Sequence, residues 1–348
     1  MSQPIVFVTY ATARPVSMIG VLKRCLRLAD RLHAEGHRIQ MLHFGDLPHD
    51  GMVAEARARY DWHTPDIADS RPRPVNAWLE RTAPALVVLG ECPISGSMRT
   101  AFRESLQLGL RTACIDNYHS RLSARYFRRM WPGVGTWLLV GLPELGGFGW
   151  IEDDIFVAPP LVPGLGRRLP APAGTLLLFG YDPEVARFAH DLHRRLPSPP
   201  PETVLMTGSF GMELAGGAPA GMRVVVSPGE TAYVAELNRA RVVVGKNGFQ
   251  QMVEAVGAGA HMLCLQRPGG VPPELLPEHL QPYLRLTDGR AEAIEPLAAL
   301  VSGWLGTAGD NPWPARLAEL NDPVALAAAV LSSLLPGSPA LAAAGGGR

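Results

Sequence analysis

Cysteine is scarce in this sequence, and its spacing is informative. The four cysteines are scattered through the chain, without the paired spacing of a zinc site or a redox motif. All of them stand in apolar surroundings, which predicts buried thiols and is typical of a cytosolic protein. They are Cys25, Cys92, Cys114 and Cys264.

The sequence also lacks a charge imbalance and a long apolar run. Acidic and basic residues are equal in number, 32 of each, so nothing predicts an electrostatic grip on nucleic acid or on an anionic membrane. No apolar stretch is long enough to span a bilayer, and no basic region precedes an apolar run at the N-terminus. We therefore expect a cytoplasmic protein without a membrane segment and without a nucleic acid partner.

What the sequence does contain is an alternation of short apolar runs and helical patterns. A chain of 348 residues suits two domains, each with its own core. Between Gly20 and Gly36 an apolar stripe recurs at helical spacing: Leu22, Cys25, Leu26, Ala29 and Leu32. Strands are expected at 4–9, 38–44, 84–89 and 111–115, with a second helix at 98–108. Repeated strand–helix–strand units predict a parallel sheet, and residues 45–75 are expected to form an irregular insertion.

The second half repeats this alternation. A run rich in proline and glycine from Phe156 to Thr175 predicts a linker. Beyond it, strands are expected at 175–179, 203–207, 223–226 and 241–244, and helices at 183–196 and 231–239. Two doubly wound α/β domains bind ligands at the carboxyl ends of their strands, in the cleft between the domains. The predicted division is a first domain at 1–160, a linker at 161–174, a second domain at 175–321 and a disordered tail at 337–348.

The segment GKNGFQQMVEAVGAGA, which starts at Gly245, has the pattern of a helix that follows a buried strand. Asn247 is expected to be its N-cap, with Gln250 completing a capping box. One face is expected to pack on the sheet, and Gly259 supplies a left-handed C-cap. The residues of that apolar face are Phe249, Met252, Val253 and Val256.

The opposite side of the same helix carries Asn247, Gln251 and Glu254. Gly248 leaves the helix N-terminus bare, so a phosphate can approach the backbone amides and the positive end of the helix dipole. Glu254 stands about 10 Å along the axis from that phosphate, where a ribose diol would offer it two hydroxyl donors. The alternative interpretation is an amphipathic surface helix with ordinary capping.

This segment resembles the donor-binding motif of glycosyltransferases with the GT-B architecture. The nearest likeness is to the N-acetylglucosaminyltransferases that make lipid II for peptidoglycan. Gly248, Glu254 and Gly259 match that motif, while His261 stands where proline is usual. The family's contacts to the donor hexose would fall at 271–274, where this chain has VPPE, so the resemblance implies nucleotide recognition more than a particular sugar.

The resemblance implies further features of the second domain. The preceding segment matches the loop that contacts the nucleotide base, which makes Glu230 and Thr231 base-loop candidates. The architecture implies two Rossmann-like domains facing across a cleft, with a last helix at 322–336 that packs back on the first domain. The complete set of donor-binding candidates is Asn247, Gly248, Gln251, Glu254, Glu230, Thr231 and Gly180.

The first domain resembles the same superfamily through GVLKRCLRLADRLHAEGHRI, which starts at Gly20. The likeness is to the nucleotide-sugar hydrolases of pseudaminic acid synthesis. Two features depart from it: the family's histidine after the glycine is Val21 here, and TYATARPVSMIG replaces the glycine-rich turn after the first strand. The matching residues are Gly20, Arg24, Cys25, Leu26, Leu28, Ala29 and Asp30.

Because Val21 cannot accept a proton, a general base must come from another strand end of the first domain. Glu91 follows the strand at 84–89, and Asp116 and His119 follow the strand at 111–115. Each has a structural alternative: Glu91 as a helix cap, Asp116 as the anchor of a turn, and His119 as an exposed side chain. Arg14 and Arg24 are candidates for donor phosphates or an anionic acceptor.

These features together favour a GT-B glycosyltransferase that moves a sugar from a nucleotide-sugar co-substrate to a small-molecule acceptor. No cofactor or metal is expected, because Asp153 and Asp154 lie near the hinge rather than in a metal-binding motif. Two alternatives stay open, namely a nucleotide-sugar hydrolase or epimerase and a non-catalytic nucleotide-sugar-binding subunit.

Overall fold

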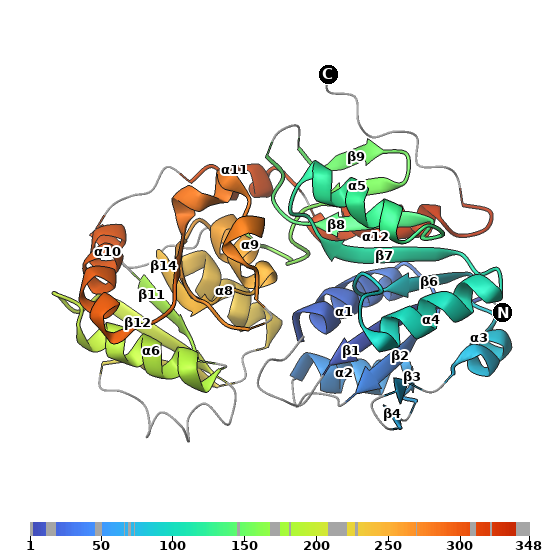
Figure 1. Cartoon of the computed structure of the whole chain (residues 1–348), viewed down its shortest axis with the longest axis horizontal. Coiled ribbons are helices and arrows are strands. Elements are labelled where there is room, and N and C mark those ends of the chain that lie inside the picture. The colour runs from blue at the N-terminus through green and yellow to red at the C-terminus, as the bar shows by residue number, and fades with distance from the viewer. Residues whose placement is uncertain are drawn as a thin grey trace. The chain divides into compact units, whose positions relative to one another are not determined.

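The chain divides into two compact units, which are described separately. Unit 1 comprises Met1–Leu161 and Asp322–Arg348, and unit 2 comprises Val162–Asn321. In Figure 1, unit 1 holds the blue and green elements together with the red helix α12. The computed structural model describes residues 3–11, 19–45, 51–65, 67–68, 71–72, 74–144, 147–167, 175–180, 182–207, 221–226, 229–268, 270–306, 311–320 and 322–338.

Unit 1 is built on an eight-stranded sheet with the order β3-β2-β1-β6-β7-β8-β10-β9. Its paired strands are parallel, except that β9 runs antiparallel to β10. The strands are β1 (Ile5–Ala11), β2 (Ile39–Gly45), β3 (Asp61–His63), β6 (Leu86–Leu89), β7 (Thr112–Asn117), β8 (Thr136–Val140), β9 (Gly149–Glu152) and β10 (Ile155–Ala158). A separate pair consists of β4 (Ile67–Ala68) and β5 (Arg71–Pro72). The helices are α1 (Ile19–Ala34), α2 (Gly51–Arg59), α3 (Asn76–Thr82), α4 (Gly96–Gln107), α5 (Arg121–Met130) and α12 (Pro323–Ser333).

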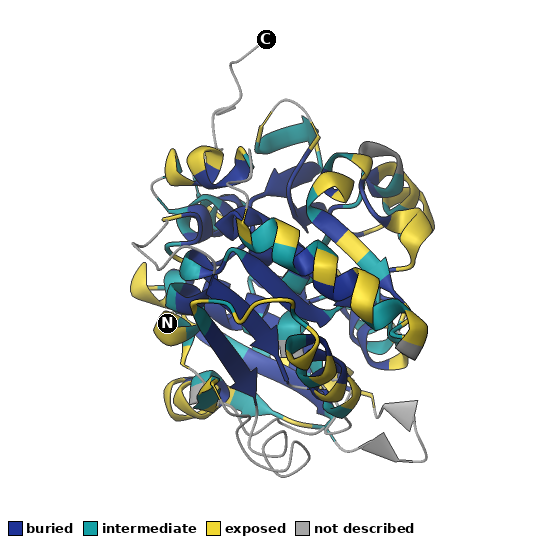
Figure 2. Cartoon of the chain, turned by 90° about the vertical axis from the view of Figure 1, so that its left-hand side faces the viewer, coloured by how far each residue is buried: buried dark blue, intermediate teal, exposed yellow. Residues whose placement is uncertain are grey.

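Alternate residues of the central strand enter two separate apolar clusters, so both faces of this sheet are covered. Along β1, Ile5 and Phe7 belong to a cluster that includes α1 and α12, whereas Val6 and Val8 belong to a cluster that includes α3 and α4. Every residue of the predicted α1 stripe is buried in the first cluster, which confirms that prediction. Figure 2, which views the chain from the left-hand side of Figure 1, shows the general pattern of dark-blue buried strands and helices with yellow exposed residues.

Unit 2 is built on a six-stranded parallel sheet with the order β13-β12-β11-β14-β15-β16. The strands are β11 (Thr175–Phe179), β12 (Glu202–Thr207), β13 (Arg223–Val226), β14 (Val242–Lys246), β15 (His261–Leu265) and β16 (Leu284–Thr287). The helices are α6 (Pro183–Arg194), α8 (Glu230–Arg239), α9 (Phe249–Ala258), α10 (Ile294–Gly306) and α11 (Trp313–Ala318), with 3₁₀ turns at Pro273–Leu275, Glu278–Tyr283 and Ala291–Ala293. The predicted α/β class with two doubly wound sheets is therefore confirmed.

In each sheet the strand order reverses at one point. The chain of unit 1 runs outward from β1 in one direction and from β6 in the other, and the chain of unit 2 does the same from β11 and β14. Doubly wound sheets bind ligands outside the carboxyl ends of the strands at this switch point. The residues that follow β6 and β14 stand there, and they include Glu91 in unit 1 and Gly248 in unit 2.

Two sequence predictions about irregular segments were wrong in part. The insertion at 45–75 contains α2 and also β3, which extends the main sheet beside β2. Val53, Ala56 and Tyr60 are buried at helical spacing among exposed polar residues, which explains why the segment looked irregular. The linker run also begins inside β10, whose side chains are all buried. The predicted tail at 337–348 falls almost wholly outside the described residues.

The four cysteines are buried free thiols, as predicted. Within the described part of the chain, no helix is both long enough and apolar enough to cross a membrane.

Candidate functional site

The first candidate site lies where β14 ends and α9 begins in unit 2. Gly248 is the N-cap of α9, and among the described residues no side-chain hydrogen bond caps this end of the helix. A Cβ placed on Gly248 would meet only the Lys246 side chain, with Cε at 3.8 Å and Cγ at 4.0 Å. The first-turn amides of α9 therefore have neither a capping side chain nor a bulky neighbour at Gly248, and a cationic side chain stands beside them.

Asn247 does not cap α9, so the predicted capping box was wrong. Its side chain is buried and points to the loop after β15: Oδ1 accepts from the Arg267 backbone N–H at 2.8 Å, and Nδ2 donates to the Val271 carbonyl at 3.0 Å. A Cβ on Gly270 would stand 2.2 Å from Asn247 Oδ1, so this loop closes tightly over the amide. The other half of the predicted box, Gln250, binds Glu254 instead.

Glu254 lies two turns into α9 and is 2% exposed. Its Oε1 accepts from Gln250 Nε2 at 2.8 Å, and its Oε2 accepts from the hydroxyl of Tyr233 on α8. The Tyr233 ring stacks on Phe179 at the end of β11, with the ring centroids 6.0 Å apart. α9 is thus not a half-exposed surface helix: it is buried from Met252 to Ala258, and Gly259 closes it with a φ of 96°, as predicted.

Three charged residues at the carboxyl-end edge of the unit 2 sheet were not predicted from the sequence. Lys246 ends β14, and burial lowers its pKa; the charge of Arg267 adds to that effect and the charge of Asp182 opposes it. Asp182 caps α6 and lies 3.5 Å from Arg267 Nε, while Arg267 also pairs with Glu184. Lys246 forms no ion pair with a described residue. Its position directly after a buried strand, as one of two lysines in the chain, was the available signal.

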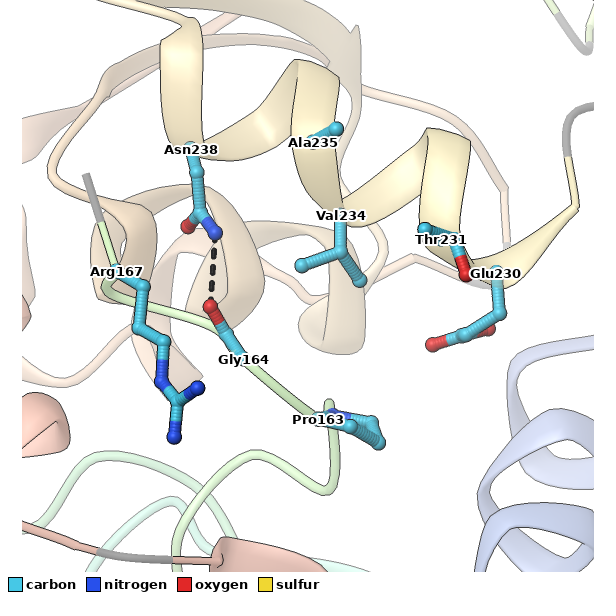
Figure 3. A pocket seen from close by; sticks show the side chains of 8 residues that line it. All are labelled: Pro163, Gly164, Arg167, Glu230, Thr231, Val234, Ala235 and Asn238. Atoms are coloured by element: carbon cyan, nitrogen blue, oxygen red, sulfur yellow. Dashed lines mark hydrogen bonds between the residues drawn. The ribbon is translucent and has the colours of Figure 1, made fainter. Parts of the chain in front are cut away.

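The base-loop candidates line a pocket of about 270 Å³ along α8. Figure 3 shows Glu230 and Thr231 at the N-terminal end of the helix and Asn238 near its other end. Asn238 fixes the opposite wall, because its Nδ2 donates to the Gly164 carbonyl at 2.8 Å and its Oδ1 accepts from the Gly166 amide at 3.0 Å. The remaining lining residues are Pro163, Arg167, Val234 and Ala235.

Two more donor candidates occupy the same edge of the sheet. Gly180 follows β11, and a Cβ there would stand 2.9 Å from Leu205 Cδ1, so an added side chain would displace the end of Leu205. Gln251 lies in the first turn of α9, and its Oε1 has no hydrogen-bond partner among the described residues. This oxygen is itself buried beside Gly245, so a ligand reaches it only after the Gln251 side chain turns.

In unit 1 the structure brings Glu91, Asp116 and Arg24 together. Burial and then the charge of Asp116 raise the pKa of Glu91 to about 7, while a hydrogen bond with Ser95 and the charge of Arg24 oppose the rise. Arg24 is buried, and its Nη1 donates to Asn117 Oδ1 at 2.8 Å.

The remaining candidates of unit 1 are less informative. His119 lies in the loop between β7 and α5 and is half-buried rather than exposed. Arg14 lies outside the described residues. Among the described residues, no group of three or more histidine, cysteine or acidic side chains is placed to hold a metal ion.

Comparisons with known proteins bear on the fold. No family model matches the chain, and no curated protein matches it. Solved structures do match over nearly the whole chain. The glycosyltransferase of kitacinnamycin has 16% identity and a TM-score of 0.60, covering 96% of this chain and 100% of its own.

Two further structures match about as well. The glycosyltransferase VinC, solved in complex with dTDP, has 12% identity and a TM-score of 0.59, with 94% and 98% covered. A Listeria monocytogenes protein assigned as a UDP-N-acetylglucosamine 2-epimerase has 13% identity and a TM-score of 0.57, with 96% of each chain covered. At this level of identity the similarity concerns the fold, and it establishes that the chain has the GT-B fold.

Proposed function

We propose that this protein is a glycosyltransferase that moves a sugar from a nucleotide-sugar donor to a small-molecule acceptor. The observation that carries the proposal is the bare N-terminus of α9 at the switch point of unit 2, with Lys246 beside it. The donor is a co-substrate, and the proposal requires no cofactor. The similar structures of the glycosyltransferase of kitacinnamycin and of VinC, which was solved with dTDP, support this choice within the GT-B fold.

The donor diphosphate is assigned to the start of α9. Backbone N–H groups at a helix N-terminus and the positive end of the dipole favour a phosphate. Lys246 adds a positive charge next to Gly248 without an ion pair to a described residue. During transfer the leaving diphosphate gains negative charge, and fixed donors and cations at that point lower the barrier.

The ribose and the base are assigned to α8 and α9. Glu254 lies about 10 Å along the helix from Gly248, and its carboxylate, which accepts from Tyr233 and Gln250, is assigned to the ribose hydroxyls. The pocket beside Glu230 and Thr231 is assigned to the nucleobase. Because Glu254 is buried beneath Tyr233, ribose binding requires the tyrosine side chain to turn aside.

A second function is favoured by two observations. The similar Listeria monocytogenes structure is assigned as an epimerase, and unit 1 holds two carboxyl groups close enough for their charges to interact. An epimerase would change the stereochemistry of the donor sugar and keep the nucleotide attached. A hydrolase would release free sugar, and a non-catalytic binding subunit would leave the donor intact.

A thermal-shift panel of nucleoside diphosphates and nucleotide sugars tests the donor site. A ligand at 100 times its dissociation constant adds about 2.7 kcal/mol to the free energy of unfolding. Donors that stabilise the protein are then incubated with and without small-molecule alcohols and phenols, and the products are separated. Glycosylated acceptor with release of nucleoside diphosphate supports transfer. If no nucleotide stabilises the protein, the proposed function is wrong.

A further inference from the structure

A buried arginine ties together the two backbone segments that carry the carboxyl pair of unit 1. Arg24 on α1 is 3% exposed, and its Nη2 donates to the carbonyl of Gly90 at 2.9 Å, while Nη1 reaches Asn117 Oδ1 at 2.8 Å. Gly90 precedes Glu91, and Asn117 follows Asp116. The guanidinium therefore sets the spacing between the ends of β6 and β7 at the switch point of the sheet.

The two carboxyl groups are held differently. Both oxygens of Asp116 accept backbone N–H bonds, from Cys92 at 3.0 Å and from Asn117 at 2.7 Å. Glu91 does not cap the helix that follows it, because Ser95 is the N-cap of α4. Asp116 is thus fixed by the backbone as part of the turn, whereas Glu91 has only a side-chain hydrogen bond, with Ser95, among the causes that set its pKa, and it is the carboxyl group assigned to the chemistry.

Gly90, the residue before Glu91, lies beside the position at which the resembled family has a histidine and this chain has Val21. Val21 occupies that position, and a Cβ on Gly90 would lie 3.0 Å from Val21 Cγ1 and 2.8 Å from Cys25 Sγ. The contact is apolar and offers no proton acceptor. The next residue along the chain from Gly90 is Glu91, whose carboxylate does accept a proton.

We propose that Glu91 is the general base of the transfer reaction and that Arg24 and Asp116 are positioning residues for it. This proposal rests on the proposed glycosyl transfer. The Glu91 carboxylate accepts the proton of the acceptor hydroxyl while the hydroxyl oxygen forms a bond to the anomeric carbon of the donor. The bond from that carbon to the diphosphate oxygen breaks, and its electron pair leaves with the nucleoside diphosphate.

The surroundings of Glu91 suit a base that works near neutral pH. Burial and then the charge of Asp116 on β7 raise its pKa, while the hydrogen bond with Ser95 before α4 and then the charge of Arg24 on α1 lower it. The thiols of Cys25, Cys92 and Cys114 interact electrostatically with Glu91, and burial raises the pKa of each, that of Cys25 to about 12, so they do not titrate in the same range. A base is most effective when its pKa lies near the working pH.

The first test uses the acidity of the acceptor. With 4-nitrobenzyl alcohol or water as acceptor, Glu91→Gln is expected to slow nucleoside diphosphate release about 10²- to 10⁴-fold. With 2-chloro-4-nitrophenol, which is already ionised at pH 8, the same variant is expected to lose far less activity. Binding of the nucleoside diphosphate, measured by calorimetry, is expected to stay within about twofold of wild type. Glu80→Gln on α3, an exposed glutamate of the same unit, serves as the matched control.

The second test uses the pH profile, which a purely structural role would not move. The wild-type rate is expected to fall below about pH 7, where Glu91 becomes protonated and can no longer accept a proton. Asp116→Asn removes a charge that raises the Glu91 pKa, so the acidic limb moves to lower pH. Arg24→Gln removes a charge that lowers it, so the limb moves to higher pH.

The outcomes separate the two proposals. If the wild type releases nucleoside diphosphate but Glu91→Gln does so at the same rate with the alcohol, the role of Glu91 is wrong and the transferase proposal stands. An equal loss with the alcohol and the phenol also contradicts base catalysis. If the wild type releases nothing from any donor that binds, both proposals fail.

Discussion

Tyr233 donates a hydrogen bond to Glu254, joining the helix beside the pocket to the helix with the bare N-terminus. The tyrosine ring is itself stacked on Phe179 at the end of β11. One side chain therefore connects the proposed base and ribose ends of the donor site. Any ligand that reaches the carboxylate of Glu254 must compete with this hydroxyl.

Glu254→Gln is expected to weaken binding of a nucleoside diphosphate by about 1.5–3 kcal/mol, the range for a hydrogen bond to a charged group. Calorimetry with the best nucleotide of the thermal-shift panel measures this. Because Glu254 is 2% exposed and accepts bonds from Tyr233 and Gln250, the variant should also lose stability, which the sequence did not suggest.

Tyr233→Phe is the control for Glu254, since it removes the same hydrogen bond but keeps the carboxylate. It is expected to lower stability without a comparable loss of affinity. If Glu254→Gln binds the nucleotide as tightly as the wild type, the ribose assignment is wrong.

Lys246→Met tests the phosphate assignment. Burial lowers the pKa of Lys246, so the folded state disfavours the charged lysine at neutral pH. Replacing it with an uncharged side chain is therefore expected to raise the melting temperature at pH 7. The same change is expected to weaken binding of a nucleoside diphosphate at least tenfold, about 1.4 kcal/mol. Binding of the parent nucleoside, which has no phosphate, should stay unchanged. Equal losses for nucleoside and diphosphate would place Lys246 away from the phosphates.

Gly270→Ala and Gly303→Ala are expected to change the free energy of unfolding in opposite directions. A Cβ at Gly270 would stand 2.2 Å from Asn247 Oδ1 and displace the amide that holds the loop after β15, so a loss of about 1–3 kcal/mol is expected. A Cβ at Gly303 in α10 meets nothing within 4 Å, and alanine there should add about 0.5–1 kcal/mol. Denaturant unfolding of both variants measures the difference. A stabilising Gly270→Ala would mean that Asn247 does not hold the loop.

The sequence predicted the fold well because the pattern of a doubly wound sheet is local. The α1 stripe, the buried runs of β11 and β14, and the left-handed Gly259 all follow from residues close in the chain. The helix α2 was missed for the opposite reason. Val53 and Ala56 on the helix and Tyr60 directly after it stand among polar residues, and only their packing in the core of unit 1 shows which face is buried.

The candidate site was predicted less well, because its geometry depends on distant segments. Asparagine is a common N-cap residue, yet the Asn247 side chain accepts a hydrogen bond from the backbone of Arg267, in a loop 20 residues later. One partner of Glu254 is Tyr233, 21 residues earlier, and no spacing rule connects these two residues. The tie between Arg24 and Asn117 spans 93 residues. Such contacts follow from strand order, which the sequence pattern does not specify.

Glu91→Gln is expected to stabilise the protein at alkaline pH. The folded-state pKa of Glu91, about 7, lies above its ordinary value of 4.5, so the fold favours the protonated form. That contribution is fully present below pH 4.5 and is lost as the pH rises through about 7. Above pH 7 the buried carboxylate therefore costs up to about 3 kcal/mol, from 1.36 kcal/mol per pKa unit.

Neutral glutamine at position 91 avoids that cost, so the gain in unfolding free energy should appear between pH 4.5 and 8 and level off above it. Urea unfolding of wild type and variant at pH 4.5, 6 and 8 measures it, with Glu80→Gln as the control expected to run parallel to wild type. If the Glu91 carboxylate destabilises the fold but is needed for turnover, Glu91→Gln should have both a higher unfolding free energy and a slower transfer rate than wild type at pH 8. If the two stability curves run parallel for Glu91→Gln as well, burial does not disfavour the ionised Glu91, and the acidic limb proposed for the rate must have another origin.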